Sequence, residues 1–285
     1  MIIWLNGKLV DKSEANLSVY DHGTLYGDGV FEGIRVYKGR IFQSQAHLDR
    51  LFESAGHIRL TIPYAKEQLH EAMEATVRAN GGQYAYIRLV ITRGEGNLGL
   101  NPFQCSRPNV FIINDNIHLY PRQMYESGMS VIIARTIRTS PRMVSPEVKS
   151  LNYLNNILAR IEAVDAGASE AIMLNEHGNV SEATGDNIFI VAGGQVITSP
   201  VDSGILVGIT RGLVMGLARD LKMAVIEKDF GPAELYAADE CFLTGSAAEV
   251  IPVTHVDGKV IGQGKVGPIT RKLMAAFSEL IAREQ

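Results

Sequence analysis

The chain has 285 residues, a length that predicts about two domains at roughly 150 residues each. Its 27 basic and 31 acidic residues give a net charge of −4, so the chain lacks the excess positive charge typical of proteins that bind nucleic acid or an anionic membrane. Hydrophobic residues make up 46% of the chain, as in globular proteins with a full core, and no apolar run approaches the ~20 residues needed to span a bilayer.

The first half of the chain is predicted to combine hairpins with amphipathic helices. Short apolar runs flank Asn6-Gly7 and again Lys38-Gly39, and both patterns predict a β-hairpin. Apolar residues then recur at three- and four-residue spacing, and later at alternate positions. We therefore expect helices over residues 47–58 and 65–80 and strands over residues 84–92 and 108–115.

The strand predicted over residues 84–92 has two different faces. Alternation places Ile87, Leu89 and Ile91 on the side of the core. Tyr86 and Arg88 share the other side. That side is either a solvated sheet face or a wall that binds an anion.

The second half of the chain mixes strands and helices irregularly. A polar stretch without periodicity, residues 121–128, is the expected linker between a small N-terminal α/β domain (1–120) and a larger C-terminal domain (129–285). This order favours a mixed α+β fold over a doubly wound parallel sheet. The elements expected here are strands over residues 129–135, 170–174, 187–197, 224–230 and 240–245 and helices over residues 151–167, 210–221 and 268–285.

Motifs for nucleotides, metals and disulfides are missing or incomplete in the sequence. Gly262 to Gly267 satisfies G-x-G-x-x-G, but only 18 residues follow, too few for the rest of a dinucleotide site. Cys105 and Cys241 lie far apart and the seven histidines show no ligand spacing, so we expect neither a disulfide framework nor a metal. The short apolar start does not match a signal peptide, which predicts a cytoplasmic protein.

Lys149 stands at the entrance of the helix predicted over residues 151–167, next to the apolar Val148 and Leu151. If the helix begins near Lys149, Tyr153 lies four residues further on the same face. Burial makes a lysine a better amine nucleophile, which Schiff-base chemistry requires. The alternative is a plain solvated lysine.

Three other segments suit a flat, phosphorylated ligand. Gly208-Ile209-Thr210 opens a predicted helix, whose first N–H groups can bind a phosphate; an ordinary Thr-capped helix is the alternative. Residues 244–249 place a hydroxyl and small residues directly after a strand. Glu182 lies among small residues that leave room beside its carboxylate; a turn carboxylate bonded to local backbone is the alternative.

Eight segments occur together and in one order: YGDGVFEGIR, HLDRL, YIR, LGLNP, VKSLNYLNNILA, SEATGDNIF, GITR and TGSAAEVIPV. This combination, which covers nearly the whole chain, resembles the class IV (fold type IV) pyridoxal-phosphate aminotransferases, and most of all the branched-chain amino acid aminotransferases. The resemblance implies a two-domain fold with pyridoxal 5'-phosphate at the domain interface. It also implies ping-pong transamination between leucine, isoleucine or valine and 2-oxoglutarate, as in branched-chain amino acid biosynthesis.

By this resemblance, Lys149 forms the Schiff base with the cofactor and moves the proton of the substrate α-carbon. Glu182 keeps the pyridine nitrogen protonated, so that the ring can accept electrons. Tyr153 would hydrogen-bond the phenolic oxygen. The phosphate would be held by Arg50, Gly208, Ile209, Thr210 and Ser246.

The substrate contacts are implied in the same way. Tyr86 and the backbone N–H groups of Ser246 and Ala247 would hold the α-carboxylate, and Arg88 the second carboxylate of glutamate. The other implied pocket residues are Tyr26, Phe31, Arg35, Leu100 and Tyr120. The loop with Leu100 would come from a partner subunit, so the resemblance implies a homodimer or a higher oligomer.

Three alternatives stay open at this point. A D-amino acid aminotransferase matches YGDGVFE and HLDRL almost as well, although Tyr86-Ile87-Arg88 together with Gly33-Ile34-Arg35 favours an L-branched-chain enzyme. Aminodeoxychorismate lyase, which eliminates pyruvate, is a second branch of the same fold. A non-catalytic protein that binds a phosphorylated ligand is the third alternative, and the presence of Lys149 argues against it.

Overall fold

The computed structural model describes residues 1–82, 84–117 and 120–284. The chain divides into two compact units. The first comprises Met1–Ile117, Val148–Asn152 and Glu284, and the second comprises residues 118–147 and 153–283. None of the helices in the described part of the chain has the length and apolar character that crossing a membrane requires.

The first unit is built on one antiparallel sheet. Its six strands, counted within the described residues, follow the order β2-β1-β6-β5-β3-β4. Both predicted hairpins are present, and Asn6, Gly7, Lys38 and Gly39 all have the positive φ that type I′ turns require. The elements are β1 (Ile2–Leu5), β2 (Lys8–Asp11), α1 (His22–Tyr26), β3 (Gly29–Tyr37), β4 (Arg40–Ile41), α2 (Ser44–His57), α3 (Lys66–Ala79), β5 (Tyr86–Thr92) and β6 (Asn109–Asp115).

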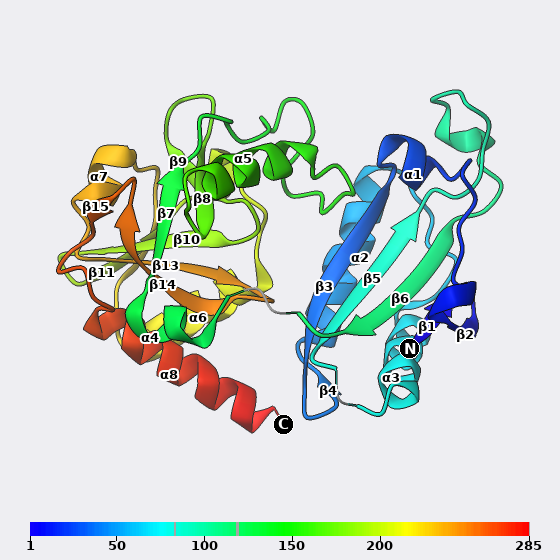
Figure 1. The fold of residues 1–285 in the computed structure, drawn as a ribbon, viewed down its shortest axis with the longest axis horizontal. Coiled ribbons are helices and arrows are strands. Elements are labelled where there is room, and N and C mark those ends of the chain that lie inside the picture. Colours follow the sequence, from blue (N-terminus) through cyan, green and yellow to red (C-terminus); the bar gives the residue numbers. More distant parts are fainter. Residues whose placement is uncertain (83, 118–119, 285) are drawn as a thin grey trace. The chain divides into compact units, whose positions relative to one another are not determined.

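Helices α2 and α3 pack on one face of this sheet (Figure 1). On that face Ile87, Leu89 and Ile91 of β5 are fully buried, as their alternation predicts. Leu51 of α2 and Leu69 of α3 are equally buried in the same core. Alternation then leaves Phe31, Tyr86 and Arg88 on the opposite face of the sheet.

The lysine segment Val148–Asn152 runs along β3 in the first unit. Val30 pairs with Ser150, the Phe31 N–H donates to the Lys149 carbonyl at 3.0 Å, and the Leu151 N–H donates to the Gly29 carbonyl at 2.9 Å. These backbone groups therefore cannot also form a helical ladder. The prediction that Lys149 and Tyr153 share a helical face is wrong, because α5 begins only at Leu154.

The second unit contains a larger mixed sheet. In its described part, eight strands follow the order β12-β11-β10-β13-β14-β7-β8-β9, and β15 pairs with β14. Its strands are β7 (Met129–Ile133), β8 (Glu170–Leu174), β9 (Val180–Ala183), β10 (Asn187–Ala192), β11 (Gln195–Thr198), β12 (Val225–Glu227), β13 (Glu240–Gly245), β14 (Glu249–Val256) and β15 (Lys259–Val260). Its helices are α4 (Arg122–Ser127), α5 (Leu154–Asp165), α6 (Ile209–Asp220), α7 (Pro232–Tyr236) and α8 (Pro268–Arg283).

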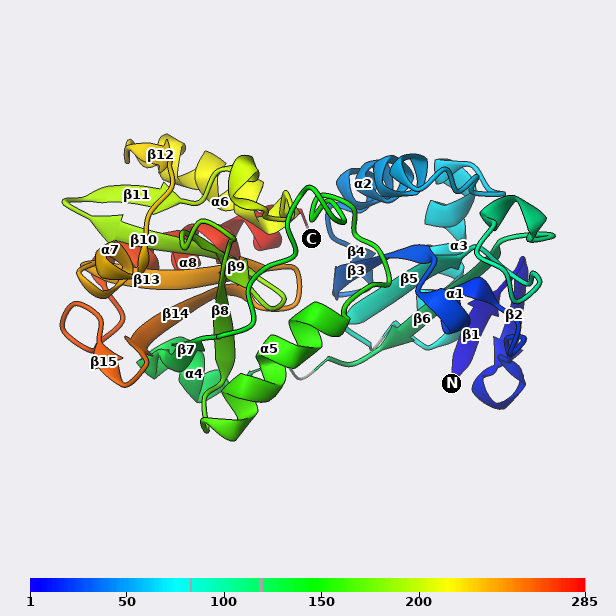
Figure 2. The ribbon, with the colours of Figure 1, turned by 90° about the horizontal axis from the view of Figure 1, so that it is seen from above.

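Two groups of helices cover this sheet (Figure 2). Helices α6 and α8 pack on each other and on β13 and β14, whereas α5 packs on β8. Against β8, helix α5 buries small residues, Ala159 and Ala163. Its larger apolar residues point to solvent.

The segment expected as a linker, residues 121–128, is not a loop between domains. Residues 122–127 form α4, which packs on β14 of the second unit. Met124 and Tyr125 lie against the core there, and the Tyr125 hydroxyl donates to the Ala248 carbonyl at 3.0 Å. The polar composition of the stretch therefore marks a surface helix.

Candidate functional site

Lys149 lies among aromatic and basic side chains in the first unit. Its Nζ is 4.6 Å from the centroid of the Phe31 ring, and the Arg88 guanidinium carbon is also 4.6 Å from that centroid. The same guanidinium carbon is 5.7 Å from the Tyr86 ring. Three segments far apart in the sequence thus place two cations and two aromatic rings together. The combination suits a ligand with an apolar part and a carboxylate.

Tyr86 depends on a glycine across the sheet. In the register of β3 and β5, Arg35 pairs with Tyr86 and Gly33 pairs with Arg88. A Cβ on Gly33 would come within 1.8 Å of the Tyr86 hydroxyl, so the hydroxyl occupies the space that a larger side chain would need. Arg35 lies 5.6 Å from the Tyr37 ring on the same strand.

Arg50 is oriented by a buried carboxylate. Its Nε and Nη2 donate to the two oxygens of Glu32, both at 2.7 Å, and His47 Nδ1 lies 2.7 Å from Glu32 Oε2. Burial opposes ionisation of Glu32, but the Arg50 charge and the hydrogen bonds from His47 and Arg50 outweigh it and lower the Glu32 pKa to about 2. Burial lowers the His47 pKa, and the charges of Arg50 and Lys149 act in the same direction.

The loop with Leu100 is attached to α1. The Tyr26 hydroxyl donates to the Leu98 carbonyl at 2.6 Å, and His22 Nε2 lies 2.7 Å from the Asn97 carbonyl oxygen. Leu100 itself is 78% exposed. The Leu100 side chain is therefore not packed into the core of the first unit, and its role stays a prediction.

The predicted pyridine partner, Glu182, lies in β9 of the second unit and is 5% exposed. Its Oε1 is 2.7 Å from Arg138 Nη2, and its Oε2 accepts from Asn187 Nδ2 at 2.9 Å and from the Leu206 N–H at 3.1 Å. Arg138 in turn donates to Asn156 Oδ1 at 2.9 Å. Sequence reasoning missed Arg138, Asn156 and Asn187, because no periodicity or motif separates them from other polar residues.

The start of α6 lies beside this carboxylate. Gly208 is the N-cap residue, and a Cβ there would come within 2.0 Å of Asn187 Oδ1. Asn187 Nδ2 donates both to Glu182 and to the Leu206 carbonyl, at 2.8 Å. Ile209 and Thr210 are in the first turn, where N–H groups have no intrahelical acceptor and the helix dipole favours an anion.

The remaining predicted residues belong to the second unit, and their roles stay predictions. Ser246 and Ala247 are half-buried in the turn between β13 and β14. The Tyr120 hydroxyl donates to Glu170 at 3.0 Å, and burial together with Asp186 and Glu170 raises the Tyr120 pKa. Tyr153 is the residue immediately before α5.

Each unit by itself carries groups that suit one part of a planar phosphorylated aldehyde with a ring nitrogen. In the first unit Lys149 offers an amine, and in the second Glu182 offers a carboxylate that Arg138 and two N–H donors hold in place. The first turn of α6 offers N–H groups to a phosphate, without a side chain at Gly208 in the way. The described residues contain no metal site of the usual kind, since no group of three or more His, Cys, Asp or Glu side chains among them could hold a metal ion.

The start of α8 does not offer a second anion site. Glu240 accepts the N–H groups of Ile269 and Thr270, at 3.0 and 2.7 Å. A carboxylate of the chain therefore occupies the position where a phosphate would bind. This arrangement agrees with the rejection of the glycine motif at Gly262–Gly267 as a nucleotide site.

Comparison with known proteins adds a family and several close relatives. The family model described as amino-transferase class IV matches residues 29–256. The branched-chain-amino-acid aminotransferase of Pseudomonas aeruginosa is 39% identical over 99% of this chain and 93% of its own length. The crystal structure of the Escherichia coli branched-chain amino acid aminotransferase superposes with a TM-score of 0.96, at 35% identity, over 100% of this chain and 95% of that one. The crystal structure of the branched-chain amino acid aminotransferase from Thermobaculum terrenum in its PLP-form (holo-form) superposes with a TM-score of 0.89, at 31% identity, over 100% of this chain and 94% of that one.

Proposed function

Because the chain belongs to the class IV aminotransferases, we propose that it transfers the amino group of branched-chain L-amino acids to 2-oxoglutarate with pyridoxal 5'-phosphate as cofactor. The observation that carries the proposal is the position of the Lys149 amine against the Phe31 ring, which the Arg88 guanidinium also contacts. The free cysteines agree with a reducing compartment, and we place the reaction in the cytoplasm.

The chain's own groups divide the work. Lys149 Nζ binds the cofactor and carries the proton of the substrate α-carbon. Glu182, held as a carboxylate by Arg138, keeps a proton on the pyridine nitrogen. Arg50 and the first turn of α6 bind the phosphate. When bound, pyridoxal phosphate supplies the electron sink for the α-carbanion.

The substrate range follows from the open face of β5. Phe31 offers apolar surface to the side chain of leucine, isoleucine or valine, and Tyr86, on the same face of the sheet, would hold the α-carboxylate. Arg88 lies against the same Phe31 ring, so a longer side chain that ends in a carboxylate can reach a cation there. One pocket can therefore serve glutamate and the branched-chain amino acids in turn.

An absorption titration tests this function. Purified protein loaded with pyridoxal phosphate is mixed separately with L-leucine and with D-alanine. We expect a yellow band that only L-leucine converts to the pyridoxamine form, and borohydride reduction before substrate should attach the cofactor to Lys149 by peptide mass. Lys149→Arg keeps the charge and should lose the band, whereas Lys66→Arg, a change of the same kind outside the site, should keep it.

The other outcomes decide between the alternatives. Conversion by D-alanine alone would place the chain with the D-amino acid aminotransferases, and release of pyruvate from aminodeoxychorismate without transamination would make it a lyase. No band after added cofactor would refute the enzyme assignment.

The active form is a homodimer in this proposal. Its support is helix α5, which buries Ala159 and Ala163 but exposes five larger apolar side chains: Leu154, Ile157, Leu158, Ile161 and Val164. Residues spaced in this way form one apolar stripe, and a stripe on the outside of a monomer indicates an interface. A two-fold axis can place the stripe against its own copy, and the exposed Leu100 loop supports a partner's contribution.

The oligomeric state is tested by light scattering on a size-exclusion column. We expect a dimer or a multiple of it for the wild type and a monomer for Ile161→Glu. Val260→Glu changes another half-exposed apolar residue, on β15, and should leave the assembly unchanged. A wild-type monomer would refute the dimer without affecting the assignment of Lys149.

A further inference from the structure

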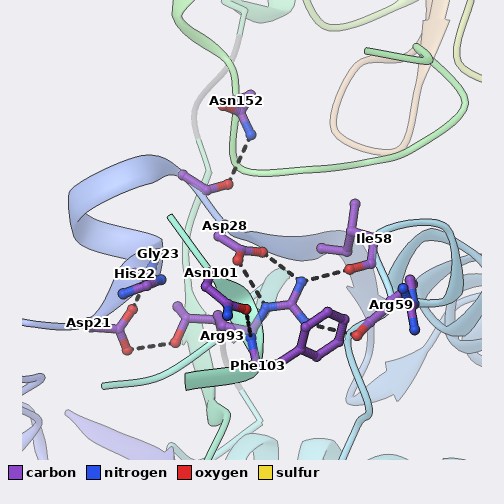
Figure 3. A network of polar contacts seen from close by, with 12 residues as sticks. Asp21, His22, Gly23, Asp28, Ile58, Arg59, Arg93, Asn101, Phe103 and Asn152 are labelled. Carbon is purple, nitrogen blue, oxygen red and sulfur yellow. Dashed lines mark hydrogen bonds and ion pairs between the residues drawn. The ribbon is translucent and has the colours of Figure 1, made fainter. Parts of the chain in front are cut away.

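We propose that Arg93 and Asp28, neither of them among the predicted site residues, act as a positioning pair for Lys149. The inference rests on the proposed role of Lys149, but its central test does not require activity. It starts from a polar network at the end of β5 in the first unit (Figure 3).

Arg93 follows directly after β5 and is 6% exposed. Its Nε and Nη2 donate to the two carboxylate oxygens of Asp28, each at 2.9 Å, in a two-bond ion pair. The Arg93 backbone N–H also donates to the Asp28 carbonyl at 2.9 Å. Side chain and backbone of Arg93 thus both hold Asp28, the residue just before β3.

The same guanidinium group reaches the end of α2. Nη2 donates to the Ile58 carbonyl at 2.7 Å, and Nη1 donates to the Arg59 carbonyl at 2.8 Å. Carbonyl oxygens at a helix C-terminus carry partial negative charge, which a buried cation stabilises. Arg93 therefore ties the C-terminus of α2 to the start of β3 (Figure 3).

The segment Val148–Asn152, which contains Lys149, is hydrogen-bonded both to α2 and to the start of β3. On the α2 side, the Lys149 N–H donates to Ser54 Oγ at 3.1 Å. On the β3 side, the Leu151 N–H donates to the Gly29 carbonyl and Asn152 Nδ2 donates to the Gly27 carbonyl, both at 2.9 Å. Gly27 and Gly29 are the two neighbours of Asp28.

The position of the Lys149 amine therefore depends on the distance between α2 and the start of β3. Glu32–Arg50 links the two elements near the middle of α2, and Arg93–Asp28 links them at its end. Loss of the second link leaves one charge of the Arg93–Asp28 pair without its partner. The 148–152 segment can then move, although the changed residue does not itself contact Lys149. A displacement of about 1 Å at a reacting group can reduce the rate by 10²-fold.

Hydrogen exchange in the cofactor-free protein tests this directly. We expect the amides of Lys149 and Leu151 to exchange at least about tenfold faster in Arg93→Gln and in Asp28→Asn, because these amides open locally once the link is lost. In the double variant these amides should exchange no faster than in either single variant. Glu240→Gln is the matched control, since Glu240 is a buried carboxylate with several hydrogen bonds but caps α8 in the second unit. It should lower the melting temperature and leave the two amides unchanged.

Activity supplies an independent readout if the loaded protein transaminates. Arg93→Gln should lower kcat by about 10- to 10²-fold with little change in KM, because the amine is misplaced while Tyr86 and Arg88 still bind substrate. Arg93→Lys keeps the charge and should recover part of the loss. If Arg93→Gln does not fold, Asp28→Asn and Asn152→Ala, which removes only the bond to Gly27, take its place.

Unchanged exchange at Lys149 and Leu151 in the folded variants would overturn the proposal, as would an equal increase in Glu240→Gln. Absence of transamination in the wild type would instead refute the proposed function, and the exchange result would still decide whether the pair positions the segment.

Discussion

Arg138 and Glu182 form a buried ion pair in the second unit, with Nη2 and Oε1 2.7 Å apart and less than a tenth of either side chain exposed. The carboxylate has two further N–H donors, and Arg138 has Asn156. Glu182 is therefore fixed in direction by groups of the chain itself. A carboxylate held in this way is suited to keep a proton on a neighbouring ring nitrogen rather than on itself.

Loss of Arg138 should cost more stability than loss of any surface arginine. We expect Arg138→Met to lower the free energy of unfolding by about 3–5 kcal/mol, because Glu182 would stay buried without its counter-charge. Urea denaturation of the cofactor-free protein measures the change. Arg135→Met is the control: Arg135 is in the same segment, 95% exposed, and 3.6 Å from Glu162, so we expect about 0–1 kcal/mol. Equal effects in the two variants would contradict the importance of the buried pair.

Glu32 should make the first unit sensitive to acid. Its pKa falls from 4.5 in the unfolded chain to about 2 in the folded protein, so the stabilisation is complete above pH 4.5 and disappears as the pH falls toward 2. The linkage amounts to roughly 3 kcal/mol. Denaturation midpoints between pH 7 and 2 should show the difference between wild type and Glu32→Gln shrinking over the lower part of this range. Glu74→Gln, in an exposed ion pair with Arg78, should show no comparable trend.

Alanine substitutions at Gly208, the N-cap residue of α6, and at Gly212 within the helix should have different effects on cofactor binding and stability. Gly208→Ala forces Asn187 away and should weaken binding of pyridoxal phosphate, because Asn187 holds Glu182 beside the first turn. A Cβ at Gly212 meets nothing within 4 Å, and Gly212→Ala should stabilise the protein by about 0.5–1 kcal/mol through higher helix propensity. Fluorescence titration with the cofactor and thermal melts check the pair. Unaltered binding in Gly208→Ala would argue against a phosphate at this turn.

Gly33 should affect binding of the substrate carboxylate, because it leaves room for the Tyr86 hydroxyl. Gly33→Ala must displace the Tyr86 hydroxyl, and we expect kcat/KM for L-leucine to fall by about 10²-fold, the effect of a misplaced positioning group. Gly56 in α2 has nothing within 4 Å of its Cβ position, so Gly56→Ala should leave the kinetics unchanged. Steady-state kinetics with both substrates make the comparison. A normal kcat/KM in Gly33→Ala would show that Tyr86 does not bind substrate.

Several elements follow from local patterns because their causes are local. The two type I′ hairpins need only Asn6-Gly7 and Lys38-Gly39, whose backbones accept positive φ at modest cost. Helices α2, α3, α6 and α8 have one apolar face each, and β5 alternates over its first four residues. The family was predicted from eight short segments and is confirmed by the match over residues 29–256.

Other elements depend on partners far away in the chain. The pattern does not predict β9, which has only four residues, or β14, which contains Pro252. Residues 122–127 are polar enough for a loop, but packing of Met124 and Tyr125 on the second core makes them a helix. The sequence places Lys149 near a helix start, but its segment instead forms an isolated β-bridge and backbone hydrogen bonds with β3.

The sequence alone predicts which groups react, since the amine of Lys149 and the carboxylate of Glu182 lie in recognisable segments. The sequence does not predict the contacts that hold these groups in place. Arg138 and Asn187 reach Glu182 from two different segments, and Asn156, from a third, holds Arg138. Arg93 links the end of α2 to the start of β3 across 34 and 65 positions. Such contacts leave no periodic trace, because a polar side chain that fixes another one can come from any point that folding brings within about 3 Å.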